Sequence, residues 1–192
     1  MNNKLKNVSR KLSKLLRHDL TNFTHDLHGF VELDLILKSD TVFKGIKIDD
    51  IKTIVDQDEK SRFSLEFKNN KYFIRANQGH TTGKLNDSEM LTPLNEQIEG
   101  CFHATFSSNI NSIKKNGLSR MERKHIHIAE SDNAKSGKRK TSNVKIYINM
   151  KSAIEDGIKF YQSENKCILT PGNDDGILLP KYFLKIEEVN KN

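Results

Sequence analysis

Two segments with strand-like composition lie on either side of the turn KNNK: RFSLEF at 62–67, which alternates apolar and polar residues, and KYFIRA at 71–76. Alternation with a period of two is typical of a β-strand with one buried face. An Asn-containing turn between two such segments is typical of a hairpin. The sequence therefore predicts a β-hairpin over residues 62–76.

Helical patterns precede this hairpin. Four apolar residues share the i, i+4, i+7, i+8 spacing of one helix face: Val8, Leu12, Leu15 and Leu16. This stripe predicts a helix over about residues 3–18. We also expect a strand at Phe30–Val31, a helix at Leu33–Lys38 and a third helix capped by Asp49 or Asp50. Helices followed by a hairpin are typical of a winged-helix-like, nucleic-acid-binding module.

The second part of the chain has shorter elements. Residues 81–97 combine Gly, Asn, Asp, Ser and Pro without periodicity, which predicts a linker between lobes at 1–80 and 98–192. Strands are expected at CFHAT, HIHIA, VKIYIN and CILT. Helices are expected at SNINSIKKNG, ending before Gly117, near ESDNAKSG and at MKSAIEDG. The predicted class is α+β, with a mixed or antiparallel sheet in the second lobe.

The chain is basic, with a net charge of +7 and a pI of about 9.3. Lys and Arg are spread along the chain rather than gathered in one tail, which favours several surfaces that face one polyanion, nucleic acid first. No apolar run approaches a membrane span, and we expect no signal peptide. Cys101 and Cys167 lie in apolar segments and lack the CxxC or Cys/His spacing of metal ligands. Reduced core thiols, and hence a cytoplasmic location, are expected.

Arg and His residues stand at the ends of many predicted elements: Arg17, His18, Arg62, Arg75, His80, His103, Arg123, His125, His127 and Arg139. The planar guanidinium suits phosphate, and imidazole can move a proton near neutral pH. Solvated cations that complement helix ends are the alternative interpretation. His125 and His127 alternate on a predicted strand but lack a third ligand, so no metal is expected.

The motifs SKLLRHD, DEKSRF, IRANQGH, FHAT, GLSRMERKHIHIA and SGKR occur in this order over about residues 8–185. Their order and spacing resemble the RNA 2′-phosphotransferase family (Tpt1/KptA). The resemblance implies an N-terminal winged-helix-like, RNA-binding lobe and a C-terminal ADP-ribosyltransferase-like lobe that binds NAD⁺. It also implies NAD-dependent removal of an internal 2′-phosphate from RNA, of the tRNA splice-junction type. The products would be 2′-OH RNA, nicotinamide and ADP-ribose 1″,2″-cyclic phosphate.

The resemblance also implies roles for individual residues. The phosphate-handling, catalytic set of the family corresponds here to Arg17, His18, Arg62 and Arg123. The cofactor-binding set corresponds to His103, Thr105, Asn109, Gly117, Leu118, His127 and Arg139. The family usually has His-Gly-Thr where this chain has His103-Ala104-Thr105. The extra methyl would restrict a backbone that has to approach the nicotinamide closely.

Two other functions remain open at this point. A non-enzymatic winged-helix nucleic-acid-binding protein would explain the charge and the first lobe, but not FHAT and HIHIA. An ADP-ribosyltransferase that acts on nucleic-acid phosphate ends, or on a protein, would explain the second lobe. An enzyme that acts on a protein would leave the Arg/His/Arg/Arg set without a task. A monomer is expected.

Overall fold

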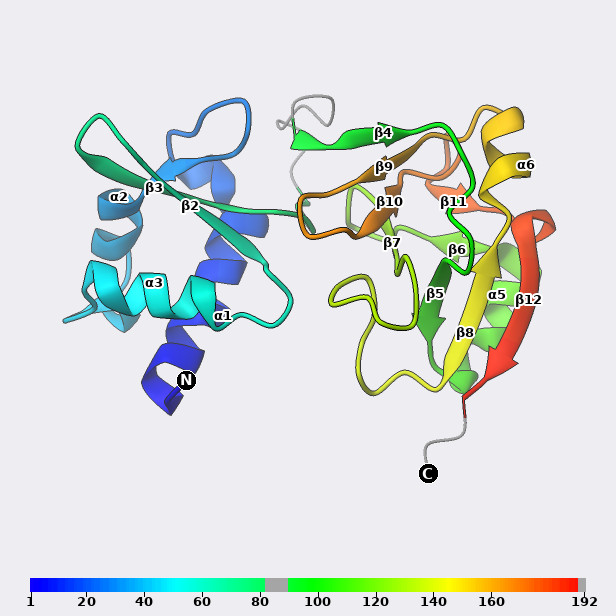
Figure 1. The fold of residues 1–192 in the computed structure, drawn as a ribbon, viewed down its shortest axis with the longest axis horizontal. Helices are drawn as coiled ribbons and strands as arrows, with labels where there is room; N and C mark the ends of the chain where they lie inside the picture. Colours follow the sequence, from blue (N-terminus) through cyan, green and yellow to red (C-terminus); the bar gives the residue numbers. More distant parts are fainter. Residues whose placement is uncertain (82–89, 190–192) are drawn as a thin grey trace. The chain divides into compact units, whose positions relative to one another are not determined.

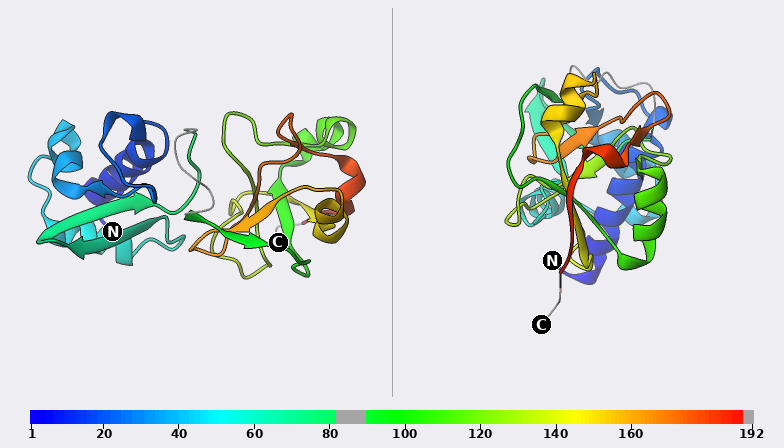
Figure 2. Two further views of the ribbon diagram at one scale, coloured as in Figure 1. Left: turned by 90° about the horizontal axis from the view of Figure 1, so that it is seen from above. Right: turned by 90° about the vertical axis from the view of Figure 1, so that its right-hand side faces the viewer.

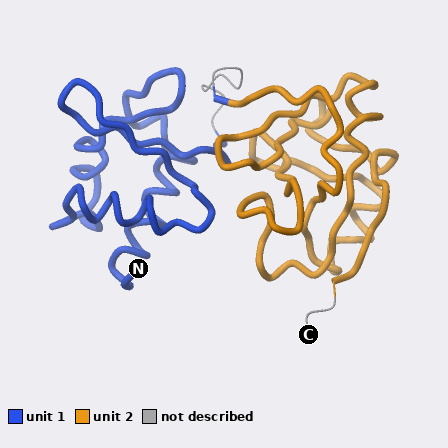
Figure 3. Tube along the Cα trace, in the orientation of Figure 1, with its two compact units in different colours: residues 1–90 blue, residues 91–192 orange. Residues whose placement is uncertain are grey.

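The computed structural model describes residues 1–81 and 90–189 (Figure 1). The chain divides into two compact units, residues 1–90 and 91–192 (Figure 3). Each unit has its own hydrophobic core and is considered separately below.

Over its described residues, unit 1 combines three helices with a small sheet. Its elements are α1 (Asn3–Arg17), β1 (Val31–Glu32), α2 (Leu33–Lys38), α3 (Ile48–Asp56), β2 (Phe63–Lys68) and β3 (Lys71–Ala76). Short 3-10 helices occur at Leu20–Asn22 and Thr41–Phe43. The sheet is antiparallel with the order β1-β3-β2.

The hairpin of unit 1 has an unbroken register from Phe63↔Ala76 to Lys68↔Lys71. Its two turn residues, Asn69 and Asn70, both have left-handed backbones with φ of 52° and 58°. This conformation is that of a type I′ turn, whose twist matches paired strands and which Asn tolerates. The predicted hairpin is confirmed, and the two strand-like segments with the Asn-Asn turn explain why it forms.

The core of unit 1 lies where α1 packs against the other helices and the hairpin. The helix buries the predicted stripe and one earlier residue: Leu5, Val8, Leu12, Leu15 and Leu16. Ile36 of α2, Ile54 of α3 and Ile74 of β3 are all fully buried in the same cluster. Full burial of a Leu or Ile side chain stabilises the fold by roughly 1.5–3 kcal/mol, so this stripe fixes the orientation of α1.

Across residues 91–189, unit 2 is built from short strands and two short helices. Its elements are β4 (Thr92–Leu94), β5 (Phe102–Thr105), α5 (Ile110–Asn116), β6 (Leu118–Ser119), β7 (Ile126–Ile128), β8 (Val144–Ile148), α6 (Met150–Glu155), β9 (Phe160–Gln162), β10 (Ile168–Thr170), β11 (Ile177–Leu178) and β12 (Phe183–Glu188). Further 3-10 helices occur at Ser107–Asn109 and Pro180–Tyr182.

The strands of unit 2 form three small antiparallel sheets, with the orders β4-β9-β10-β7, β11-β6 and β12-β8-β5. A two-way backbone bridge between Phe102 and Ala129 connects β5 with the end of β7. The helices α5 and α6 lie at the margin of the unit (Figure 2). The buried core includes Ile126, Ile146, Phe160 and Ile168, so it lies where these sheets meet.

The structure agrees with the predicted α+β class and with most expected elements, and it corrects three. The third helix is capped at Lys47, one residue before Ile48, and Asp50 instead accepts a hydrogen bond from the Lys47 N–H at 2.9 Å. The second correction concerns the segment ESDNAKSG, which forms turns rather than the expected helix. Its Asn, Asp, Ser and Gly residues favour local turns over helical hydrogen bonds.

The third correction concerns the predicted linker at 81–97. Residues 82–89 of that range lie outside the described residues. Thr92–Leu94 forms β4, which pairs with β9 and therefore belongs to unit 2. A three-residue edge strand that contains Pro93 has no alternation to reveal it.

Across residues 1–81 and 90–189, every helix is too short or too polar to span a membrane. The same residues contain no group of three His, Cys, Asp or Glu side chains placed to hold a metal ion.

Candidate active site

Arg17 and His18 stand at the C-terminal end of α1. The last helical residue is Arg17, and the N–H of His18 closes the helix by donating to the Lys14 carbonyl at 2.8 Å. Arg17 is half-buried and His18 is exposed. Positive charge in the last turn complements the helix dipole and so stabilises the helix. This effect does not explain why the Arg17 side chain is half-buried.

The segment that follows β3 packs against Arg17. Thr81 donates its backbone N–H to the Arg17 carbonyl at 3.0 Å. Gly79 has a φ of +86°, and a Cβ built on it would lie 3.4 Å from Nε of Arg17. Glycine therefore allows the backbone to turn and to pass close to the guanidinium, where another residue would be strained.

Arg62 is anchored by a buried carboxylate. Its backbone N–H donates to Oδ2 of Asp58 at 2.5 Å, and its guanidinium forms an ion pair with Oδ1 of the same side chain. The Asp58 side chain is only 5% exposed, whereas that of Arg62 is 34% exposed. Asp58 is the sole ion-pair partner of this guanidinium among the described residues. The rest of the guanidinium can therefore serve a ligand.

Asn77 links Arg62 to the segment that packs on Arg17. Its backbone N–H donates to the Arg62 carbonyl at 2.8 Å, and its side-chain amide donates to the Ser61 carbonyl at 2.9 Å. The Ser64 hydroxyl donates to Oδ1 of Asn77 at 2.7 Å. Asn77 is buried. The short segment Asn77–Thr81 thus brings two of the predicted phosphate residues, Arg17 and Arg62, into one hydrogen-bonded structure.

Arg123 lies in unit 2, in the turn between β6 and β7. Arg123 is exposed. Its backbone N–H donates to the Arg120 carbonyl at 3.1 Å, and the Arg120 guanidinium donates to the Arg123 carbonyl at 2.8 Å. These bonds fix the backbone at Arg123 and leave its side chain exposed to a ligand.

His103 and Thr105 point to the same face of β5, since they are two residues apart on a strand. Nδ1 of His103 lies 2.8 Å from the His127 carbonyl. A carbonyl only accepts, so Nδ1 carries the proton and Nε2 is left as an acceptor in the neutral ring. Burial lowers the pKa of His103, and the Arg139 charge lowers it further, against the raising effect of the His127 carbonyl. His103 is therefore neutral at pH 7.

Thr105 and Asn109 form a second polar pair beside it. The Asn109 amide donates to the Thr105 hydroxyl at 3.3 Å, and the Thr105 carbonyl accepts from the Asn143 N–H at 3.1 Å. The Thr105 hydroxyl proton remains able to donate to a ligand. Arg139 is exposed and close enough to His103 to influence its pKa. Neutral donors and acceptors next to one guanidinium form a set that suits an anionic nucleotide.

Ala104 points to the opposite face of β5. Its side chain packs against the small cluster formed by Phe102, Ala129 and Ala134, together with Tyr147. The methyl group that replaces the usual glycine is therefore directed away from the face that carries His103 and Thr105.

A family model described as RNA 2′-phosphotransferase, Tpt1/KptA family, matches residues 3–172. The chain belongs to the RNA 2′-phosphotransferase (Tpt1/KptA) family. It is therefore an RNA 2′-phosphotransferase enzyme, which confirms the resemblance carried by its motifs.

Individual members of the family are similar over nearly the whole chain. The tRNA 2′-phosphotransferase 1 of Danio rerio is 33% identical over 193 residues, which cover 95% of this chain and 85% of the relative. The human protein of the same name is 37% identical over 92% of this chain and 73% of its own length. A probable RNA 2′-phosphotransferase of Bacillus thuringiensis is 32% identical over 97% of this chain and 96% of its own length.

Three residues carried over from the RNA 2′-phosphotransferase family have clear structural tasks. Gly117 has a φ of +88°, and a Cβ there would lie 2.6 Å from the Leu178 carbonyl oxygen, so glycine lets the chain pass β11. The Leu118 side chain is buried in the core, which leaves only its backbone for a ligand. His127 lies on β7, with its Nδ1 3.1 Å from the His125 carbonyl.

Sequence reasoning missed the residues that hold the arginines in place. Asp58, Asn77 and Gly79 all lie inside the motifs DEKSRF and IRANQGH, but none of them was assigned a role. An acidic residue four positions before a candidate phosphate-binding arginine was the available signal for Asp58. Arg120 is the corresponding support for Arg123 in unit 2.

Proposed function

We propose that this RNA 2′-phosphotransferase removes an internal 2′-phosphate from RNA by transferring it to the ADP-ribose part of NAD⁺. The observation that supports this most directly is the segment Asn77–Thr81, which holds Arg17 and Arg62 by separate hydrogen bonds. Several relatives are named tRNA 2′-phosphotransferase, so we propose a tRNA splice junction as the natural source of the phosphate.

We propose a winged-helix-like, RNA-binding role for unit 1. The order helix, strand, two helices and a hairpin supports it, as does the antiparallel sheet β1-β3-β2. We propose an ADP-ribosyltransferase-like, NAD-binding role for unit 2. It is supported by the small antiparallel sheets and by the polar face of β5, which carries His103 and Thr105.

The residues of unit 2 fit the chemistry of NAD⁺. In this proposal Nε2 of His103 accepts a hydrogen bond from a ribose hydroxyl, and the Thr105 hydroxyl and Asn109 amide bind neutral polar groups. The exposed guanidinium of Arg139 suits the diphosphate. Backbone at Gly117 and Leu118, and the His127 ring, complete the set. NAD⁺ supplies an activated C1″ carbon with nicotinamide as the leaving group.

The proposed reaction has two steps that balance without a further reactant. First, an oxygen of the RNA 2′-phosphate bonds to C1″ while the bond from C1″ to nicotinamide breaks. Second, the 2″-hydroxyl oxygen bonds to phosphorus while the bond from phosphorus to the RNA 2′-oxygen breaks. The hydroxyl proton passes to that departing oxygen, which leaves 2′-OH RNA and ADP-ribose 1″,2″-cyclic phosphate.

The catalytic residues serve these steps differently. Arg17, Arg62 and Arg123 bind the phosphate oxygens, where negative charge increases in the second step. In the first step the same cations position the phosphate but also reduce its nucleophilicity. His18 ends α1 as an exposed imidazole, a group that can transfer a proton near neutral pH, and is assigned to the 2″-hydroxyl or the departing 2′-oxygen.

The test is turnover of a 2′-phosphorylated oligonucleotide with and without NAD⁺. We expect one nicotinamide released for each 2′-OH RNA formed, and no reaction without NAD⁺. ADP-ribose left permanently on a phosphate end of the RNA would instead favour an ADP-ribosyltransferase activity. Binding of RNA without any release of nicotinamide would contradict the proposal.

We further propose a cytoplasmic monomer. Both cysteines are buried, and burial raises the pKa of the Cys101 thiol to about 11, so this thiol is unreactive. Reduced, protected thiols suit a reducing compartment. A molar mass of one chain by light scattering is the expected result.

A further inference from the structure

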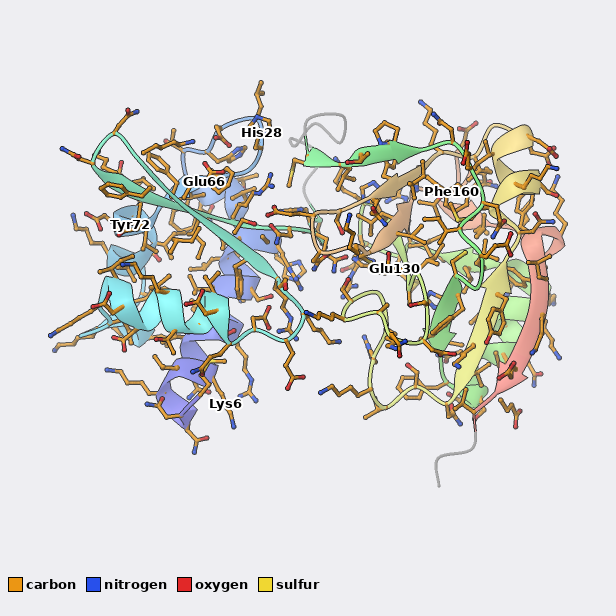
Figure 4. All side chains as sticks on the ribbon, in the orientation of Figure 1. Lys6, His28, Glu66, Tyr72, Glu130 and Phe160 are labelled. Carbon is orange, nitrogen blue, oxygen red and sulfur yellow. The ribbon has the colours of Figure 1, made fainter. Side chains whose placement is uncertain are left out.

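The solvent face of α1 is entirely basic or neutral. Lys6, Arg10 and Lys14 are exposed, and together with Arg17 they fall within about 80° of arc at 3.6 residues per turn. The opposite face buries the apolar stripe of unit 1. Figure 4 labels Lys6 in the N-terminal half of this helix. We call Lys6, Arg10 and Lys14 the α1 stripe.

None of the three α1-stripe residues forms an ion pair among the described parts of the chain. The helix NKLKNVSRKLSKLLR contains no acidic residue at all. By contrast, Lys11 lies on another side of α1 and is paired with Asp40. Its hydrogen bond is the main cause of the lowered pKa of Asp40, to which Lys14 adds only a small electrostatic effect. The stripe therefore keeps its charge uncompensated.

This arrangement is unfavourable for the helix by itself. Like charges at i, i+4, as in Lys6–Arg10 and Arg10–Lys14, repel each other. Cations near a helix N-terminus also oppose its dipole, and no acidic residue in the first turn offsets Lys4 and Lys6. An anionic ligand on this face would remove both costs.

We propose that the α1 stripe binds the phosphodiester backbone of the single-stranded RNA that flanks the 2′-phosphorylated nucleotide, and leads that strand to Arg17. The inference rests on the proposed function, which assigns Arg17 to the 2′-phosphate. From Lys6 to Arg17 the helix rises about 16 Å, a length that spans more than one phosphate of a strand. Lysine and arginine contacts to phosphates position a strand without reading its bases, so this binding is independent of sequence.

The test compares two variants that remove the same charge. The stripe variant carries Lys6→Gln, Arg10→Gln and Lys14→Gln. The control variant carries Lys4→Gln, Lys38→Gln and Lys44→Gln, three exposed lysines of unit 1 outside the stripe. Substrates are a 2′-phosphorylated dinucleotide and a longer single-stranded oligonucleotide with the same 2′-phosphorylated centre. The KM for RNA and kcat are measured over a range of salt concentrations with saturating NAD⁺.

We expect the stripe variant to raise the KM of the long RNA about tenfold or more at low salt and to reduce the slope of log KM against log salt by about 2, for three single-strand phosphate contacts. Its kcat, and its KM for the dinucleotide, should match those of the wild type. When the oligonucleotide is extended on only one side of the 2′-phosphorylated nucleotide, the rise in KM should appear for the 5′ extension or for the 3′ extension, but not for both.

An equal change in the control variant, or an equal loss with the dinucleotide, would overturn the inference. So would an unchanged KM and salt slope in a stripe variant with a wild-type circular dichroism spectrum. Failure of the proposed function has a different signature, because the wild type would then not convert either substrate.

Discussion

The carboxylate of Asp58 holds Arg62 at two points, through its backbone N–H at 2.5 Å and through its guanidinium. Asp58 is buried and lies four residues before Arg62. It therefore acts as a positioning residue for the guanidinium that we propose binds the 2′-phosphate.

We predict that Asp58→Asn lowers kcat for 2′-phosphate removal by up to about 10²-fold, because misplacing a catalytic group by an ångström costs this much. The KM for NAD⁺ should not change, since Arg62 belongs to unit 1. Asp40→Asn is the matched control, because it breaks an ion pair with Lys11 in the same unit. A folded Asp58→Asn enzyme with wild-type kcat would show that Arg62 keeps its position without the carboxylate.

His103 gives the proposed NAD⁺ site a predictable pH dependence. Its pKa is lowered from 6.5, mainly by burial, so the ring stays neutral as the pH falls to 6.5 and takes up a proton only below it. Protonation turns Nε2 from an acceptor into a donor. We expect the KM for NAD⁺ to rise as the pH falls through this lowered pKa, and kinetics between pH 5 and 8 would measure it.

Two variants distinguish the contribution of His103 to this pH dependence from that of the other histidines. His103→Ala should strongly reduce NAD-dependent turnover while RNA binding stays close to that of the wild type. His103→Gln keeps an acceptor that does not titrate, so the acid-side rise in KM should disappear. The free energy of unfolding of the wild type should also fall below pH 6.5, because the unfolded imidazole binds a proton that the folded one resists. Unchanged turnover in His103→Ala would rule out the cofactor assignment.

The position of Ala104 predicts that its replacement by glycine changes the stability of the fold but not cofactor binding. Its methyl packs beside Phe102 and Tyr147, on the other face of β5 from His103. Ala104→Gly should therefore lower the free energy of unfolding by about 1 kcal/mol, the usual cost of glycine in a strand, and leave the KM for NAD⁺ unchanged. Chemical denaturation and steady-state kinetics test both parts. Much tighter NAD⁺ binding in the variant would mean that the methyl obstructs the cofactor.

Arg62 and Arg123 should matter more for the second step than for the first. In the proposed mechanism each stabilises charge that increases on the phosphate when it becomes the electrophile, and one such donor is worth about 10²–10³ in rate. We predict that Arg62→Ala or Arg123→Ala accumulates RNA-2′-phospho-ADP-ribose, which the wild type does not. Gel analysis of labelled RNA over time would detect it. Equal loss of both steps, with no adduct at any time, would limit these arginines to substrate binding.

Sequence patterns predict the regular parts of this fold well, for local physical reasons. The i, i+4, i+7, i+8 apolar spacing defines α1, and the alternation in β2 together with the turn at Asn69 and Asn70 defines the β2–β3 hairpin. The strands of unit 2 that the sequence does not predict include β9 and β11, whose three and two residues form no recognisable pattern. Their pairing depends on partners far away in the chain.

The candidate site shows the same division. Motifs identify Arg17, Arg62 and His103, but only the fold shows how they are held. The φ of +86° at Gly79 allows the backbone to pass close to Arg17, and Asn77 forms hydrogen bonds with residues that precede it by more than ten positions in the sequence. The face on which Ala104 lies likewise follows from the register of β5 with β8, which pairs His103 with Ile146.

The most direct measurement of the central claim follows the phosphate itself. An RNA labelled with radioactive phosphorus in its internal 2′-phosphate is incubated with the enzyme and NAD⁺, and the labelled products are separated. The account predicts that the label leaves the RNA and appears in ADP-ribose 1″,2″-cyclic phosphate, in equal amount to the 2′-OH RNA formed. Label in inorganic phosphate, or release of the label without NAD⁺, would contradict it.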